Sequence, residues 1–183
     1  VWVKLYGSSD SDKVKLYWDC FDWPEDLIGF EIKKLNEDTW VSLHDEPVVP
    51  MVKTGRSFSN QGLTTDEGNG LSKLQQNYID EGLVNEVDAK EMRAVLIENN
   101  GLGSGDRIRM KNNFELAVII GFGFVDHGFS SGDAPQYGIF GVYDDGSTDK
   151  EPLDVFHLAY TGDIILDIEF ARENEGLSIA WRL

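Results

Sequence analysis

The chain has 183 residues and a formal net charge of −17 at pH 7, from 33 acidic and 16 basic side chains. Nucleic acids and anionic membrane surfaces are bound by clustered Lys and Arg, so this charge argues against both as partners. A hydrophobic content of 41% with one cysteine, Cys20, predicts a globular domain without an intrachain disulfide. No apolar run is long enough to cross a membrane, so no membrane insertion is expected.

The beginning of the chain predicts a β-meander. Val14, Leu16 and Trp18 recur at every second position, which is the period of a half-buried strand. Similar alternation, interrupted by polar turns, predicts four short strands at residues 2–6, 14–18, 29–35 and 39–43.

The pattern changes in the middle of the chain. Residues 53–70 are rich in Gly, Ser, Thr and Asn and predict a loop. Residues 71–80 then have the apolar spacing of a helix. A second helix is predicted to start at Asp88, which forms a capping box with Glu91, and to end at the sequence Asn-Asn-Gly of residues 99–101.

Strands are predicted again after these helices. The apolar run at residues 114–125 predicts a long strand, with a bend or bulge at Gly121 and Gly123. A strong turn signal follows at residues 144–147. Three further strands are predicted at residues 107–111, 137–143 and 155–160.

The end of the chain repeats the pattern of its beginning. Residues 165–181 align with residues 2–18 without a gap, so that Trp181 falls on Trp18 at an offset of 163 residues. Repeats of this kind indicate stacked modules. We therefore expect one module at residues 1–163, and we expect residues 164–183 to be the first two strands of a following repeat or a terminal pairing hairpin.

Several segments resemble fibronectin type III and related immunoglobulin-like modules. Val14-Lys15-Leu16-Tyr17-Trp18, Pro24 and Gly29-Phe30-Glu31-Ile32 fit an alternating strand ending in Trp, a Pro-containing loop and a strand with an aromatic. Residues 137–143 with the turn Asp145-Gly146-Ser147 resemble the last two strands. The resemblance implies a mainly β, immunoglobulin-like (fibronectin type III-like) β-sandwich in which Tyr137 is the tyrosine-corner residue.

The length of the chain departs from this resemblance. Such modules have about 100 residues, and the matching segments are separated by roughly residues 46–113. We therefore expect the sandwich to carry a small α-helical insertion at about residues 46–113.

No catalytic motif stands out. His44, His127 and His157 lack the spacing of metal ligands and are predicted to be isolated surface or turn residues. Cys20 is predicted to be a small buried thiol near a strand end rather than a nucleophile. The glycine-rich run at residues 101–105 matches neither a nucleophile elbow nor a P-loop.

An acidic turn is the candidate metal site. Asp145, Ser147, Asp149 and Glu151 fall at alternate positions, so a looped backbone would point several oxygens at one place. Calcium takes about six to eight oxygen ligands, which makes it the cofactor that this turn would suit. The alternative interpretation is a solvated turn without a metal, and in that case no cofactor is expected.

Two tryptophans are the candidate ligand-binding residues. Trp23 and Trp40 flank one predicted strand, and if they are exposed together they form a stacking platform for sugar rings. The alternative interpretation places both rings in the core.

Together these features favour a non-enzymatic structural or adhesive module of a repeated extracellular or surface assembly. It would act through protein–protein contacts with other chains, including copies of itself. The helical insertion would carry the contact surface, and the expected core residues are Trp18, Phe30, Tyr137 and Phe140. Two alternatives stay open: a carbohydrate-binding accessory module, assisted or not by calcium, and a glycan-acting hydrolase with a carboxylate pair near the insertion.

Overall fold

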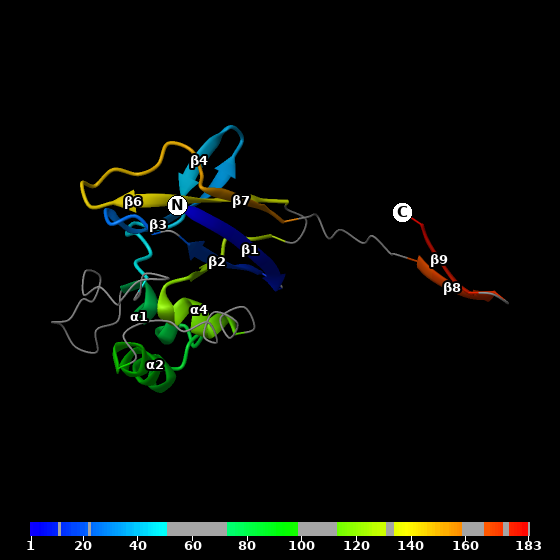
Figure 1. The fold of residues 1–183 in the computed structure, drawn as a ribbon, viewed down its shortest axis with the longest axis horizontal. Helices are drawn as coiled ribbons and strands as arrows, with labels where there is room; N and C mark the ends of the chain where they lie inside the picture. Colours follow the sequence, from blue (N-terminus) through cyan, green and yellow to red (C-terminus); the bar gives the residue numbers. More distant parts are fainter. Residues whose placement is uncertain are drawn as a thin grey trace.

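A computed structural model describes residues 1–10, 12–21, 23–50, 73–98, 113–130, 134–158, 167–173 and 176–182. This part of the chain is mainly β, and two antiparallel sheets form a sandwich-like body (Figure 1). The three-stranded sheet has the order β1 (Trp2–Asp10), β2 (Lys13–Phe21) and β5 (Gly123–Asp126). The four-stranded sheet has the order β4 (Thr39–Ser42), β3 (Leu27–Asn36), β6 (Gln136–Tyr143) and β7 (Asp154–His157).

Alternation along β1 and β2 buries one face of their hairpin against the four-stranded sheet. Trp18 is fully buried, and its ring centroid lies 5.7 Å from that of Phe30 and 6.4 Å from that of Phe122, both in edge-on contacts. Burying a large apolar side chain contributes about 1.5–3 kcal/mol, so the sandwich depends mainly on this layer. The same cluster contains Leu5, Leu16, Cys20, Ile32, Tyr137 and Ile139.

Phe140 is buried as expected, but on the outer face of the four-stranded sheet. Successive residues of a strand point to opposite faces, and Ile139 faces the core between the sheets. Trp40 of β4 packs edge-on against the Phe140 ring at a centroid distance of 5.6 Å. The Nζ atom of Lys33 lies 4.6 Å from the same ring centroid. Phe140 therefore stabilises the outside of this sheet rather than the contact between the sheets.

Contacts between β1 and β7 close one side of the sandwich. Asp154 of β7 accepts a hydrogen bond of 2.7 Å from the backbone N–H of Leu5 and forms an ion pair of 3.2 Å with Lys4. The ring of Phe156 packs against Gly7, where an added Cβ would lie 2.5 Å from a ring carbon. β1 is an edge strand of its sheet, so these contacts cover an edge that would otherwise be open to pairing.

The apolar run that predicted one long strand at residues 114–125 is instead a helix followed by a short strand. Helix α4 (Phe114–Ile120) is capped by the side chain of Asn113, which accepts a hydrogen bond of 3.1 Å from the N–H of Leu116. Gly121 ends the helix in the left-handed region at φ 88°, and β5 begins at Gly123. Both faces of α4 are buried, so its apolar run has no helical periodicity to distinguish it from a buried strand.

The helices form a layer on the side of the three-stranded sheet that faces away from the four-stranded sheet (Figure 1). α4 links the two parts, because Ala117 and Ile120 belong to the sandwich core while Val118 and Ile119 belong to a second cluster. This second cluster also contains Tyr78 of α1 (Lys73–Asp80), Ala89 of α2 (Glu86–Glu98), Val84 and Val125.

Both helices predicted at residues 71–80 and 88–98 are present, but the second one begins earlier than expected. Asn85, not Asp88, caps α2: its side-chain oxygen accepts hydrogen bonds from the N–H groups of Val87 at 2.9 Å and Asp88 at 3.3 Å. An Asn at the N-cap satisfies N–H groups that have no partner within the helix. None of the helices in the described ranges is long and apolar enough to cross a membrane.

The last two strands form a separate two-stranded sheet with the register of the first hairpin. β8 (Asp167–Glu173) pairs with β9 (Gly176–Arg182), and Ile168 lies opposite Trp181. In the first hairpin Leu5 lies opposite Trp18. Adding the sequence offset of 163 to both members of that pair gives residues 168 and 181, so the alignment of the two segments holds for the strand pairing as well.

Several predictions lie outside the described residues. These are the loop at residues 53–70, the helix end at residues 99–101, the glycine-rich run at residues 101–105, the strand at residues 107–111, and the end of the strand expected at residues 155–160.

Candidate functional site

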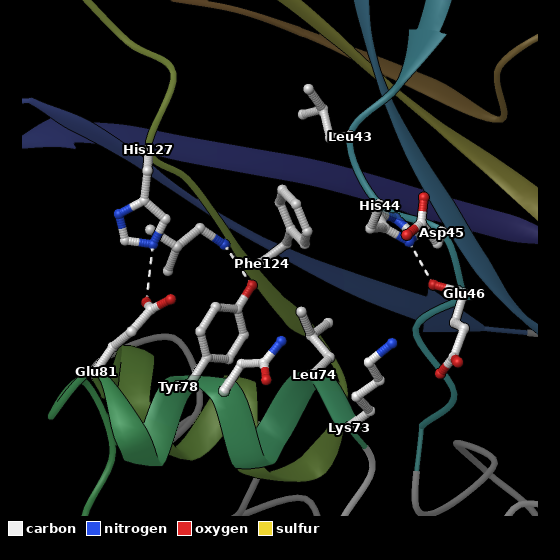
Figure 2. Close-up of a pocket in the computed structure, with 12 residues that line it drawn as sticks. Leu43, His44, Asp45, Glu46, Lys73, Leu74, Tyr78, Glu81, Phe124 and His127 are labelled. Carbon is white, nitrogen blue, oxygen red and sulfur yellow. Dashed lines mark hydrogen bonds and ion pairs between the residues drawn. The ribbon is translucent and has the colours of Figure 1, made fainter.

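A groove lined by described residues lies between α1, β5 and the segment that follows β4 (Figure 2). It has a volume of about 280 Å³. Its apolar floor consists of Leu43, Leu74, Phe124 and Val125. Its polar lining consists of His44, Asp45, Glu46, Lys73, Asn77, Tyr78, Glu81 and His127.

His44 is a structural residue on one wall of this groove. Its Nε2 accepts a hydrogen bond of 2.9 Å from the N–H of Ile32, so the proton of the neutral ring is on Nδ1, which donates to the carbonyl of Glu46. Burial lowers the pKa of His44, although the Glu46 carbonyl and the nearby carboxylates of Glu31 and Asp45 act in the opposite direction. The prediction of an isolated surface or turn residue is therefore wrong for His44, whereas His127 and His157 are exposed as expected.

Two buried polar side chains hold α1 against the sheet. The Oη of Tyr78 accepts a hydrogen bond of 2.9 Å from the N–H of Val125, and Gln75 donates from Nε2 to the carbonyl of Ile119. Tyr78 is only 3% exposed, and burial raises its pKa well above the usual tyrosine value. The hydroxyl therefore stays neutral and positions the helix.

The rim of the groove carries charges of both signs. Glu81 at the end of α1 lies 3.1 Å from Nε2 of His127, and both side chains are about half exposed. Asp45, Glu46 and Lys73 complete the rim. Because the lining residues include no Ser, Thr or Cys and both ring nitrogens of His44 are engaged, this set of described residues holds no nucleophile activated by a histidine. An apolar floor with a charged rim is a binding arrangement.

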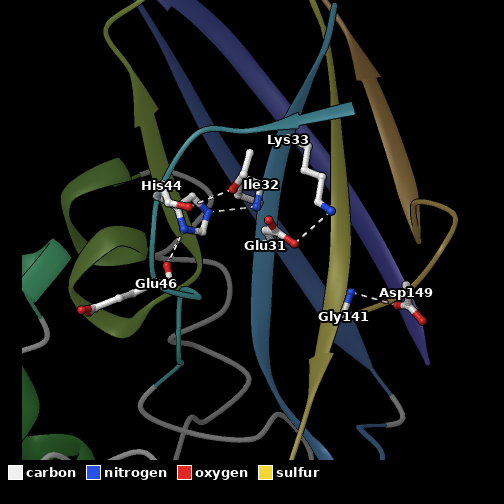
Figure 3. A network of polar contacts seen from close by, with 8 residues as sticks. Glu31, Ile32, Lys33, His44, Glu46, Gly141 and Asp149 are labelled. Carbon is white, nitrogen blue, oxygen red and sulfur yellow. Dashed lines mark hydrogen bonds and ion pairs between the residues drawn. The ribbon is translucent and has the colours of Figure 1, made fainter. Parts of the chain in front are cut away.

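The acidic turn chosen as a calcium site is engaged in hydrogen bonds of its own. Asp149 accepts from the N–H of Gly141 at 2.9 Å (Figure 3) and from the hydroxyl of Tyr143 at 3.1 Å. Hydrogen bonds from Ser147 hold the pKa of Asp145 below its usual value. Ser147 and Glu151 are exposed. Within the described ranges, no group of three or more His, Cys, Asp or Glu side chains is placed to hold a metal ion.

Figure 3 also shows residues of β3 that lie between this turn and His44. Glu31 and Lys33 on the outer face of β3 form an ion pair of 3.0 Å. A smaller cavity of about 180 Å³ lies beside Glu31 and His44 and reaches Thr148 of the acidic turn. His44 therefore lies between two hollows, and its hydrogen bonds fix the wall that divides them.

The two tryptophans chosen as a sugar platform lie on opposite sides of the four-stranded sheet. Trp23 is 2% exposed, packs edge-on against Phe30 and Phe122, and donates from Nε1 to the carbonyl of Leu27 at 2.7 Å. Trp40 is half-buried over Phe140 on the outer face. The structure does not bring the two rings together, and Trp40 is the more accessible ring. Cys20 is fully buried near the end of β2, as expected.

The sequence interpretation did not identify the groove. Tyr78, Gln75 and Glu81 look like ordinary helix residues in the sequence, and their partners are more than forty positions away. The one signal that could have found them is a Tyr and a Gln on the apolar side of a short helix. Comparisons with protein-family models, with curated proteins and with solved structures find no match for this chain.

Proposed function

We propose that this chain is a non-enzymatic structural or adhesive β-sandwich module, similar to fibronectin type III modules, in a repeated extracellular or surface assembly. It acts through protein–protein contacts. The observation that carries the proposal is the strand order of the two sheets. In the immunoglobulin constant-type sandwich one sheet holds strands A, B, E and D, and the other holds C, F and G.

The seven strands of the sandwich can be lettered in chain order A, B, C, C′, E, F and G. The observed sheets then contain A-B-E and C′-C-F-G. This order resembles the immunoglobulin grouping, with a C′ strand beside C and with helices between C′ and E, where a D strand would come. The grouping supports the resemblance, although fold alone does not assign a function.

Tyr137 gives the proposal local support. It lies at the second position of β6, the F strand, and its hydroxyl donates to Asp126 at the end of β5, the E strand, at 2.8 Å. A tyrosine corner ties the same two strands together, although there the acceptor is a backbone group. Here the acceptor is a carboxylate, which also accepts from Gly128 N–H at 2.7 Å and pairs with Lys34 at 3.3 Å.

The second hairpin supports the repeated nature of the assembly. β8 and β9 reproduce the register of β1 and β2 at the offset found in the sequence. We propose that residues 164–183 begin a second copy of the module or pair with another chain by their apolar residues. The groove beside α1 would provide a second contact surface, since its apolar residues and its three carboxylates against one Lys fit a basic, partly apolar partner segment.

Light scattering during size-exclusion chromatography tests this function. The full chain should self-associate with rising concentration, because in the absence of a fitting module the second hairpins of two chains can cover each other's apolar residues. A version without residues 164–183 should stay monomeric with an unchanged unfolding curve. A full chain that stays monomeric at all concentrations, or a shortened chain that associates equally well, would contradict the proposal. Millimolar calcium in a parallel run tests whether the acidic turn contributes.

A carbohydrate-binding module is the second candidate, and one observation favours it. Trp40 lies on the outer face of the four-stranded sheet, where a partly exposed indole ring could stack on a sugar. Trp40→Ala should then abolish retention on a polysaccharide column while the unfolding curve changes little. Trp23→Ala is not a suitable test, because that ring is buried in the core.

A further inference from the structure

The shared register assigns each residue of the second hairpin to a position of the first. Val14, Leu16 and Trp18 of β2 are fully buried. Their counterparts at the same offset are Leu177, Ile179 and Trp181, and the counterpart of the buried Leu5 is Ile168. The second hairpin therefore has the apolar pattern needed to form one layer of a sandwich, and the question is which sheet covers it.

The first difference between the hairpins concerns Asp154 of β7. In the sandwich Asp154 lies 3.2 Å from Lys4 and accepts from the N–H of Leu5. The counterpart of Lys4 in the second hairpin is Asp167. If β8 took the place of β1, two carboxylates would meet at a partly buried position, where like charges repel.

The second difference concerns Phe156 of the same strand. Gly7 leaves room for the Phe156 ring, since even a Cβ at this position would lie 2.5 Å from one ring carbon and 2.9 Å from the next. The counterpart of Gly7 is Phe170. A benzyl group there would occupy the space of the Phe156 ring, and overpacking of this kind destabilises a close-packed core.

The exchange of Lys4 for Asp167 is balanced within each hairpin by the charge of the residue on the opposite strand. Lys4 lies opposite Asp19 in the first hairpin, and Asp167 lies opposite Arg182 in the second. Both cross-strand pairs are of opposite charge, but the signs are exchanged. Opposite charges across a ladder stabilise the pairing, so each hairpin is consistent in itself and differs in what it requires from a third strand.

We propose that β8–β9 does not replace β1–β2 in this sandwich, and that its partner is the facing sheet of a different module. That sheet carries a basic residue at the position of Asp154 and a small residue at the position of Phe156. The G strand, here β7, thus selects which hairpin completes each sandwich. This inference rests on the proposed modular function and adds a rule for which modules fit together. Specific pairing requires features that reject the wrong partner as well as contacts that favour the right one.

Hydrogen exchange on the full chain tests the rule without any knowledge of the partner. In the wild-type chain, residues 2–21 should exchange slowly and residues 167–182 quickly, because an uncovered two-stranded hairpin is only marginally stable. In the variant Asp167→Lys/Phe170→Gly, which gives β8 the residues of β1 at both positions, residues 167–182 should exchange more slowly by about tenfold or more. Protection at residues 2–21 should fall in parallel, since the two hairpins now compete.

A matched control changes two other positions of the same strand. Glu169→Lys/Ala171→Gly makes the same change in charge and adds one glycine at the positions that correspond to Tyr6 and Ser8. This control should exchange like the wild type. Three outcomes would overturn the proposal: no transfer of protection in the first variant, the same transfer in the control, or a wild-type chain in which residues 167–182 are already protected at the expense of residues 2–21. The exchange is measured at a concentration at which light scattering shows a monomer, so the readouts report on contacts within one chain.

Discussion

The first and last hairpins have the same strand register but different surroundings. β1–β2 is covered by the four-stranded sheet, and its Trp18 is fully buried. β8–β9 forms a two-stranded sheet of its own. Turn position and alternation are local properties, so a sequence repeat reproduces them. Coverage is a long-range property: β1 contacts β7 at Lys4 and Gly7, and the residues at these two positions differ between the hairpins.

The largest expected difference between the hairpins concerns their tryptophans. Trp18→Ala should lower the free energy of unfolding by about 3–5 kcal/mol, because it leaves a large cavity between Phe30 and Phe122. Among the described residues the Trp18 Nε1 has no hydrogen-bond partner, so the loss is one of packing. Urea unfolding followed by circular dichroism measures this loss.

Trp181→Ala is the matched variant in the second hairpin. It should change the free energy of unfolding of the sandwich by less than about 0.5 kcal/mol, as for a substitution outside the core. Equal losses for the two variants would mean that both hairpins contribute to one core, and the comparison would fail.

Tyr137→Phe should have the next largest effect, because Tyr137 belongs to the sheet that covers the first hairpin. The substitution removes a buried hydrogen bond to Asp126 and should cost about 1–3 kcal/mol in the same unfolding experiment. Tyr143→Phe is the control. Its hydroxyl bonds to Asp149 at 3.1 Å in a half-buried position, so its removal should cost less. A larger loss for the control would contradict the proposal that Tyr137 is a corner residue.

His44 should make the covering sheet sensitive to pH. Burial lowers its pKa in the folded state, so below the usual histidine value of about 6.5 the unfolded chain takes up a proton first. The stability that neutral His44 provides is therefore present above about pH 6.5 and is lost as the pH falls further. His44→Gln should unfold with a weaker dependence on pH between about 5 and 7 than the wild type. Parallel pH profiles for the two proteins would rule out this role.

The smallest expected effect is that of the Lys4–Asp154 ion pair. Lys4 is about half exposed, so Lys4→Ala should cost only about 0.2–1 kcal/mol. Lys4→Asp, which gives β1 the charge of β8, should cost more than Lys4→Ala because it adds repulsion. If the two variants have the same urea midpoint, Asp154 does not discriminate between the hairpins by charge.

The β part of the fold was predictable because its signals are local. Alternation at Val14, Leu16 and Trp18 predicted β2, and the gapless alignment predicted two strands at the end of the chain. The same approach failed at residues 114–125, since α4 is buried on both faces and has no periodic pattern. It also failed for the capping of α2, where Asn85 is used instead of Asp88.

The candidate site could not be predicted, because it consists of contacts between distant segments. Tyr78 meets Val125 and Glu81 meets His127 only once α1 packs beneath β5. His44 looked isolated for the same reason, since its partner is the backbone N–H of Ile32 in β3. Trp23 and Trp40 both flank β3 in sequence, but only the fold shows that they lie on opposite sides of the sheet.

The most direct test of the modular function is light scattering on the full chain and on Trp181→Asp, run over the same range of concentrations. The substitution places a charge at the position that corresponds to the fully buried Trp18. We predict that the wild-type chain associates as its concentration rises, and that Trp181→Asp stays monomeric with an unchanged urea midpoint. The same mass at every concentration for both proteins would contradict a second hairpin that mediates contacts between modules.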